Sequence, residues 1–521
     1  MTLLSRVLGL VRDIGMAQLF GLGPVMDAFT VAFRIPNLAR RLFGEGAVSV
    51  SFLPIFAREL EHPDRTSAWR LASAVFTLLS LFLAALVLLA EAGLWGLSAF
   101  GDLGAENDLL VSLTALMLPY LVLVCLAAQV AGVLNSLGHF TWPAFAPVLL
   151  NVCWIIGIWG LAPLFTAQET QARLLAVCIV IAGGLQLAVQ GPALRSYGYR
   201  FTIGWKEVRP QVIAVLRGML PVVVALSITQ INTFADSLIA WGFSAPEGVE
   251  GTRMPLPGAP YYPLRSGAVA TLYYGERMYQ FPLGVFGVAL GTVLFPLLAR
   301  HAARGETERL RTDLSLGLRL VIAIGVPASA ALVWFAEPIA RVLFQRGAFQ
   351  PEDTLRTARV IAVYGSAVWS YCGVLILQRA FYALGDRVTP LRTGLLAVGF
   401  NFCVNLLLIW PLAEAGLALG TVGSSLLQLI CLTWGLQHLV GALDWSHLVR
   451  TLMRTLSATG VMLVAARAGE HLLGVLPVDL ASPDRLLLLL TCSAVGFLAA
   501  ARLFGIEEFW LLLRRERPPE P

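Results

Sequence analysis

The sequence predicts an all-α polytopic membrane protein with fourteen transmembrane helices, arranged as two six-helix bundles in a parallel pseudo-twofold repeat plus two C-terminal helices. Three observations predict this fold: the composition, a series of long apolar runs, and an internal repeat. Of the 521 residues, 57% are hydrophobic and only 13% are charged, whereas a soluble domain carries about 25% charged residues. This composition excludes a soluble enzyme, a disordered chain and a secreted disulfide-bonded scaffold.

The apolar runs are long enough to cross a bilayer, which takes about 20 residues of helix. Runs bounded by proline, glycine and charge predict fourteen helices. They lie at 3–22, 26–57, 70–98, 108–137, 144–165, 172–195, 211–242, 268–299, 313–335, 355–383, 389–410, 415–439, 448–469 and 484–504. Several runs exceed what a bilayer requires, so we expect tilted or kinked helices.

Basic residues gather on alternate connections between these helices, at 58–70, 195–209, 300–311 and 387–392, and again in the tail after residue 513. The first two connections on the opposite side contain neither arginine nor lysine, although Arg341, Arg346 and Arg356 lie on that side further along. The positive-inside rule therefore predicts that both termini are cytoplasmic.

Two short motifs recur at nearly the same offset. The stretch Pro54 to Arg58 matches Pro296 to Arg300, an offset of 242 residues, and Leu137-Gly138 matches Leu384-Gly385. Since an even number of helices separates the equivalents, the halves share one orientation, and a cleft between them is the natural substrate route. The predicted parts are a first bundle (1–198), an interfacial connector (199–210), a second bundle (211–410), two additional helices (411–505) and a cytoplasmic tail (506–521).

A polar stripe follows the second predicted helix at steps of three and four residues, which places it on one helical face. Its members are Asp27, Thr30, Arg34, Asn37, Arg41, Glu45 and Ser49. Further charges inside predicted spans are Arg6, Arg12, Asp13, Arg217, Asp236, Glu276 and Arg277. A central arginine costs about 2.5–3.5 kcal/mol to insert, so these groups must line a wet cavity or pair with each other.

Arginine outnumbers the acids in this set, so a cavity lined by it would attract an anion. The forked guanidinium suits phosphate oxygens, and the predicted cargo is a phosphate-bearing, amphiphilic anion. Two other interpretations remain open. Arg40 and Arg41 can be interfacial residues that extend to the headgroups, and Asp27 with Arg34 can belong to a structural ion-pair network.

A second group of polar residues suggests an ion site. Asp236 is a lone acid in the seventh span, Asn401 and Asn405 are one turn apart on the eleventh, and Thr421 lies on the twelfth. Oxygen ligands of this kind suit Na⁺, or the acid could carry a proton, but ordinary hydrogen bonding between helices explains the last three residues equally well. Catalysis has little support. Lys206, the only lysine, precedes Glu207 and so cannot complete a phosphate-binding loop, and neither HExxH nor GxSxG occurs.

The N-terminal motifs resemble the MurJ (MviN) lipid II flippase family of the multidrug/oligosaccharidyl-lipid/polysaccharide exporter superfamily. The matching stretches are Ser5 to Gly9, Arg12-Asp13, Asp27 to Phe29, Pro36 to Ala47, and Arg277 to Pro296. The resemblance covers essentially the whole chain. It implies a transporter in the bacterial cytoplasmic membrane that moves undecaprenyl-diphosphate-linked peptidoglycan precursor to the periplasmic leaflet by alternating access.

The resemblance also implies site residues and partners. Arg6, Arg12, Arg40 and Arg277 match the family's cavity arginines, Asp27 its cavity acid, and Asn37 and Glu45 other important positions. Asp236, Asn401, Asn405 and Thr421 resemble the Na⁺ site of some members. The periodicity favours Arg41 on the stripe, whereas the family favours Arg40. Expected partners are lipid II, membrane lipids and the cell-wall synthesis machinery, with a monomeric transporter, no cofactor beyond a coupling ion, and no nucleic acid.

Three other functions compete with this interpretation. A cation-coupled multidrug exporter of the same superfamily would need an acidic lumen. An intramembrane glycosyltransferase acting on polyprenyl phosphates would need acids on a loop at the membrane face and a large external site. A non-transporting scaffold would not need a continuous polar lumen.

Overall fold

The structure is a computed structural model that describes residues 2–62, 65–101, 103–202, 204–249, 251–254, 260–475 and 482–508. Within its helices, the side chains of residues 2, 3, 45, 47, 48, 224, 225, 228, 229, 231, 474 and 475 are not described. The chain divides into two compact units, one made of 1–270 with 346–349 and the other of 271–345 with 350–521.

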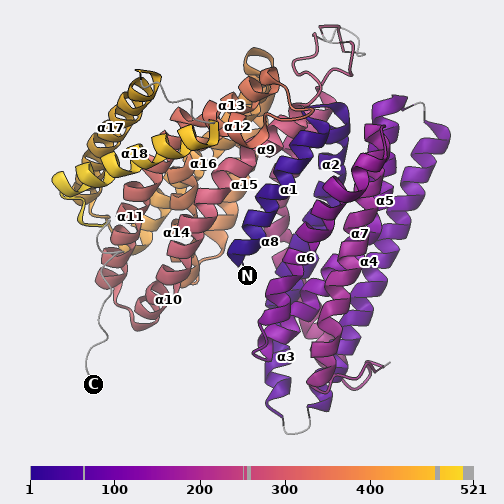
Figure 1. The fold of residues 1–521 in the computed structure, drawn as a ribbon. Helices are drawn as coiled ribbons and strands as arrows, with labels where there is room; N and C mark the ends of the chain where they lie inside the picture. The colour runs from indigo at the N-terminus through magenta and orange to yellow at the C-terminus, as the bar shows by residue number, and fades with distance from the viewer. Residues whose placement is uncertain are drawn as a thin grey trace. The chain divides into compact units, whose positions relative to one another are not determined.

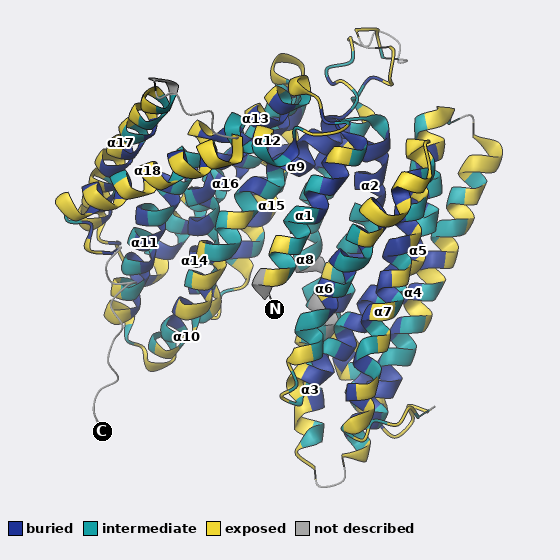
Figure 2. Ribbon diagram, viewed as in Figure 1, coloured by how far each residue is buried: buried dark blue, intermediate teal, exposed yellow. Residues whose placement is uncertain are grey.

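The first unit is a helical bundle built around α5, which packs against α2, α4 and α7 (Figure 1). Its helices are α1 (Thr2–Phe20), α2 (Pro24–Ala39), η1 (Arg40–Ala47), α3 (Val48–Leu60), α4 (Thr66–Phe100), α5 (Gly104–Ser136), α6 (Thr141–Ile156), η2 (Gly157–Leu161), η3 (Ala162–Leu164), α7 (Gln168–Ser196) and α8 (Arg209–Gly242). The outer face of α4 is largely exposed, as a lipid-facing helix requires (Figure 2).

The second unit is built around α14, whose Ile376 and Phe381 are fully buried in a core with Leu314 and Leu432. Its helices are α9 (Ala268–Pro282, which begins in the first unit), η4 (Leu283–Gly287), α10 (Val288–Arg304), α11 (Thr307–Trp334), α12 (Ala336–Phe344), α13 (Pro351–Gly365), α14 (Val368–Ala383), α15 (Val388–Leu412), α16 (Glu414–Val440), α17 (Trp445–Val475) and α18 (Ser482–Leu503).

The last two helices, α17 and α18, pack on each other and on α11 through a small apolar core that includes Met462 and Phe497. The segment after α18 is held to the same unit by a buried carboxylate. Glu508 accepts a hydrogen bond from Thr451 at 2.9 Å and pairs with Arg319 at 3.3 Å.

Ten described helices are long and apolar enough to span a membrane, or eleven if the bent pair α13–α14 counts as one span. Every predicted span coincides with a helix or with a series of consecutive helices. The predicted spans outside the ten or eleven are α1 and the series α2–η1–α3, which carry three or more charged residues each, and α8, part of which lies among the side chains not described. The fold is therefore an all-helical multi-pass membrane fold.

Two of the long predicted helices are broken by π-helical segments. The span predicted at 26–57 is α2, the π-helix η1 and α3, and the span predicted at 268–299 is α9, the π-helix η4 and α10. Pro36 lies four residues before η1, and Pro282 directly before η4. A proline cannot donate its backbone hydrogen bond, so the α-helical ladder is interrupted nearby.

Candidate functional site

The polar stripe of the second predicted helix passes from α2 into the π-helix η1. It is regular from Asp27 to Asn37 within α2, and the wider turn of η1 begins at Arg40. Residues four apart stay on nearly the same side in both kinds of helix, and Arg34 and Arg41 both contact α8, through Thr233 and Gln230. The side chain of Glu45 lies outside the described residues.

The two neighbouring arginines at the start of η1 have different surroundings. Arg40 is half-buried and lines a cavity of about 500 Å³ in the first unit, together with Ser49, Asn135 and Gln186. Arg41 is exposed and donates from Nη1 to Oε1 of Gln230 on α8, at 3.1 Å. Of these two arginines, Arg40 is the one that lines this cavity.

Arg12 is buried in the packed interface between α1 and α6. Its Nε and Nη2 atoms donate to Asp13 Oδ1 at 3.0 and 2.7 Å, and Nη1 donates to Asn151 Oδ1 at 3.1 Å. The guanidinium carbon lies 4.5 Å from the ring centre of Trp154. Since the carboxylate, the amide and the ring all satisfy the cation, its charge is compensated inside the bundle.

Arg6 lies nearer the start of α1 and is half-buried. Among the residues that the structure describes, it forms no ion pair, in contrast to Arg12. Sequence reasoning grouped the two arginines together because both interrupt the same apolar run. Asn151 is a lone amide in the apolar span 144–165, and an amide inside a membrane needs a hydrogen-bond partner. This was the available signal that Asn151 contacts one of the two arginines.

Asp27 is 2% exposed and holds the beginning of α9. Its carboxylate accepts backbone hydrogen bonds from Gly267 at 2.8 Å and Ala270 at 2.7 Å. A carboxylate at a helix N-terminus satisfies donors that have no partner within the helix, and it interacts favourably with the helix dipole. Further along α2, Arg34 donates to the backbone oxygen of Thr233 at 2.7 Å, and Asn37 is half-buried.

Arg277 belongs to the second unit and is half-buried on α9. Its guanidinium stacks on Tyr273, with 4.6 Å to the ring centre, and donates to the Tyr273 hydroxyl at 3.0 Å and to Gln280 Oε1 at 3.3 Å. Both partners lie within one turn on the same helix, so α9 itself fixes the orientation of the cation. Sequence reasoning missed Tyr273 as a partner, although the spacing of four residues was the available signal.

The predicted ion-site residues are divided between the units. In the second unit, Asn405 donates to Asn401 Oδ1 at 3.0 Å, and Asn401 donates to Thr421 Oγ1 at 3.4 Å. Asp236 belongs to the first unit, where it is 4% exposed on α8. Within the second unit, the structure thus brings Asn401, Asn405 and Thr421 together, in contacts that join α15 to α16. Among the described residues, no group of three or more His, Cys, Asp and Glu side chains could hold a metal ion.

A family model described as "Lipid II flippase MurJ" matches residues 16–475, which is most of the chain and includes Arg40, Asp27 and Arg277. The chain belongs to the MurJ lipid II flippase family. It is a transporter and not an enzyme, and it serves peptidoglycan biosynthesis as a lipid II flippase. The expectation from the N-terminal motifs is confirmed, and the glycosyltransferase alternative is wrong.

Relatives agree with this assignment to the MurJ family. The chain is 34% identical over 532 residues to "Probable lipid II flippase MurJ" of Rhizobium tropici, covering 99% of this chain and 95% of that one. It is 34% identical to "Lipid II flippase MurJ" of Burkholderia cenocepacia, covering 84% and 82%.

Two solved structures share the fold. A lipid II flippase MurJ in an inward closed conformation has a TM-score of 0.76 at 20% identity, covering 98% of both chains. An inward-facing MATE family transporter has a TM-score of 0.63 at 15% identity, covering 86% of this chain and 96% of that one.

Proposed function

We propose that the protein moves lipid II from the cytoplasmic to the periplasmic leaflet of the bacterial inner membrane by alternating access of two six-helix bundles. The proposal includes fourteen spans, both termini in the cytoplasm, and a monomeric transporter working beside the cell-wall synthesis machinery. The location of basic residues on alternate connections supports this orientation. Rocking of one repeat against the other opens such a cleft to either side in turn.

The observation that carries the substrate assignment is the position of Arg40 on the wall of a cavity in a membrane-embedded bundle. An ionisable residue at membrane depth is stable where water or a polar ligand reaches it. The guanidinium offers paired donors to the two phosphate groups of the lipid carrier. Ser49 and Asn135 on the same wall offer neutral hydrogen bonds, which suit the sugar.

The remaining candidates receive different roles in this proposal. Arg6 and Arg277 join Arg40 in binding the diphosphate, and Tyr273 positions Arg277. Arg12 pairs with Asp13 on α1 and contacts Asn151 and Trp154 on α6, so its role here is to fix α1 against α6. Asp27, which holds the start of α9, helps to close the route. Asn37 and Glu45 are included as substrate-binding residues on the family resemblance alone.

Complementation in cells depleted of their own flippase tests the proposal, with expression of each variant verified on blots. Arg40→Gln and Arg277→Gln should fail to restore growth and should leave lipid II inaccessible on the outer leaflet. Arg40→Lys should restore part of the function because it keeps the charge and loses the fork. Arg304→Gln, which removes an exposed charge at the end of α10, is the control and should grow normally. Full growth of both Gln variants would refute the anion-binding role.

We further propose that transport is coupled to Na⁺ or a proton through Asp236 with Asn401, Asn405 and Thr421. The existing contacts among the three neutral residues supply oxygen atoms close together, which a cation could share. If Na⁺ binds, the purified protein should melt at a higher temperature in sodium chloride than in choline chloride. Asp236→Asn should abolish this difference. An equal melting temperature in both salts at every pH, with transport unaffected by Asp236→Asn, would exclude coupling at this set.

A further inference from the structure

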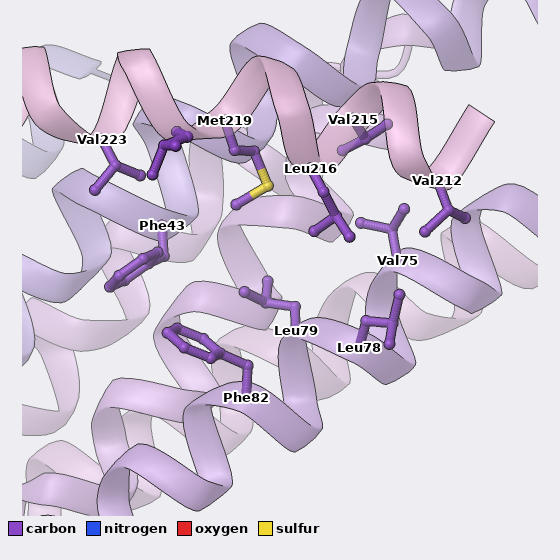
Figure 3. Close-up of a pocket in the computed structure, with 11 residues that line it drawn as sticks. Phe43, Val75, Leu78, Leu79, Phe82, Val212, Val215, Leu216, Met219 and Val223 are labelled. Atoms are coloured by element: carbon purple, nitrogen blue, oxygen red, sulfur yellow. The ribbon is translucent and has the colours of Figure 1, made fainter. Parts of the chain in front are cut away.

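An apolar groove of about 370 Å³ lies in the first unit between α4, η1 and α8. Figure 3 shows its side chains: Val75 and Val212 face each other near one end, and Phe43 lies near Val223 at the other. Every residue that lines it is hydrophobic, and none of them lines the cavity that contains Arg40. The groove is therefore a separate feature that the transport proposal does not use.

The edge of this groove is apolar and exposed on the surface of the first unit. Phe82 is 52% exposed, Leu216 50% and Leu220 69%, and all three are lining residues. In a membrane protein, exposed side chains of this size on spanning helices contact acyl chains. A hollow between them is filled by lipid hydrocarbon, since an empty apolar cavity forfeits dispersion contacts on its walls.

One end of the groove carries positive charge. Val212 lies three residues after Arg209, on the same face at the start of α8, and Lys206 precedes that start in the connector. Both cations are exposed, and neither forms an ion pair with any residue in the described ranges. The nearby acids are already engaged, because Glu207 pairs with Arg70, and Glu59 accepts from Ser67 and Gln211.

We propose that this groove binds one acyl chain of an anionic glycerophospholipid whose phosphate lies at Arg209 and Lys206. The exposed Trp205 beside them is the residue type that marks the headgroup level. Basic residues at the membrane surface attract anionic headgroups. The volume lies at the low end of ligand pockets, which are about 300–1,000 Å³, and this suits a single acyl chain better than a long polyprenyl tail.

The bound chain would fill the space between α4 and α8 and so couple these two helices within the first unit. Native mass spectrometry of the full-length protein tests this, with titrated phosphatidylglycerol and phosphatidylcholine as probes. The wild-type protein should retain phosphatidylglycerol at a lower concentration than phosphatidylcholine. In the double variant Lys206→Gln/Arg209→Gln, the affinity for phosphatidylglycerol should fall by on the order of thirty-fold, and the preference over phosphatidylcholine should be lost. Arg304→Gln should keep it. Equal retention of the two lipids by wild type, or an unchanged preference in the double variant, would overturn the proposal.

A groove-filling variant tests the acyl-chain half of the proposal. Leu216→Trp should reduce retention of both lipids, whereas Leu88→Trp places the same ring on an exposed position of α4 outside the groove and should leave retention unchanged. Equal retention by these two variants would exclude the groove. A polyprenyl diphosphate that displaces phosphatidylglycerol from wild type but not from Leu216→Trp would make the substrate tail the occupant and overturn the assignment.

Discussion

The two broken helices of the repeat share a backbone feature and differ in chemistry. The π-helix η1 begins at Arg40 and η4 begins at Leu283, an offset of 243 residues that matches the repeat in the sequence. The first break carries two arginines and an acid, whereas the second is built from leucine, glycine, valine and phenylalanine. Both halves therefore contain a π-helical interruption, but only the one in the first half carries charged residues.

The predicted site residues also differ in charge between the two units. In the first unit they are charged, with Arg12 against Asp13 and Asp27 against backbone N–H groups. In the second unit the neutral Asn401 donates to Thr421 and so joins α15 to α16, although this unit buries a charge elsewhere, at Glu508 against Arg319. A buried charge that loses its partner costs far more than a neutral hydrogen bond, so substitutions should cost more at Arg12, Asp13 and Asp27 than in the neutral cluster.

The largest effect is expected at Asp27. Asp27→Ala removes the acceptor of two buried backbone N–H groups, and each hydrogen bond to a charged group is worth about 1.5–3 kcal/mol. We expect a large fall in the melting temperature and loss of complementation. Glu106→Gln is the matched control, because Glu106 also accepts a backbone N–H, from Glu247 at 2.9 Å, but at an exposed site. If both variants melt within a degree of wild type, Asp27 does not hold α9.

The next largest effect is expected at the Arg12 pair. Asp13→Asn leaves a buried guanidinium without its carboxylate and should cost about 3 kcal/mol. Replacing both residues together, with Arg12→Met and Asp13→Leu, should cost less than the two single changes added, and denaturant unfolding of all four proteins measures the difference. Strict additivity would mean that the two side chains do not interact.

A smaller effect is expected in the neutral cluster of the second unit. A Cβ atom at position 420 would overlap the side-chain oxygen of Asn405. Gly420→Ala should therefore cost about 1–3 kcal/mol, as overpacking does. Gly399 lies on α15 with open space around its missing Cβ, and Gly399→Ala should instead stabilise the helix by up to about 1 kcal/mol. Thermal unfolding of the two variants measures these effects. An equal loss of stability in Gly399→Ala and Gly420→Ala would contradict the close contact between position 420 and Asn405.

The smallest effect is expected at the membrane surface of the first unit. The hydrogen bond from Ser67 holds the pKa of Glu59 below its ordinary value against the opposing effect of burial, with a further bond from Gln211. A carboxyl group whose pKa is lower in the folded state than in the unfolded state stabilises the fold at a pH above its unfolded-state pKa. This stabilisation is lost as the pH falls through the folded-state pKa. Glu59→Gln should therefore lower stability by about 1 kcal/mol at pH 7 and match wild type in acid. Melting curves against pH, with Glu61→Gln as control, measure this; a pH-independent difference would exclude the linkage.

The sequence by itself determined the class, the family and the positions of the helices. Every apolar run coincides with a helix or a series of helices, because a helix buried in lipid or protein needs a local run of apolar residues with helical spacing. It also determined which residues carry charge in the membrane. The short helix α12 was not predicted, since its nine residues lie between two long spans and have no run of their own.

Only the tertiary structure decided which partners those charges have. Periodicity grouped Arg41 with Arg34, and the structure shows that both contact α8, while Arg40 lines a cavity in the first unit. Likewise, residues 346–349 belong with the first unit, where Ala348 donates to the backbone oxygen of Gln18 at 2.8 Å. Such contacts join residues hundreds of positions apart, and no local pattern of size or hydropathy records them.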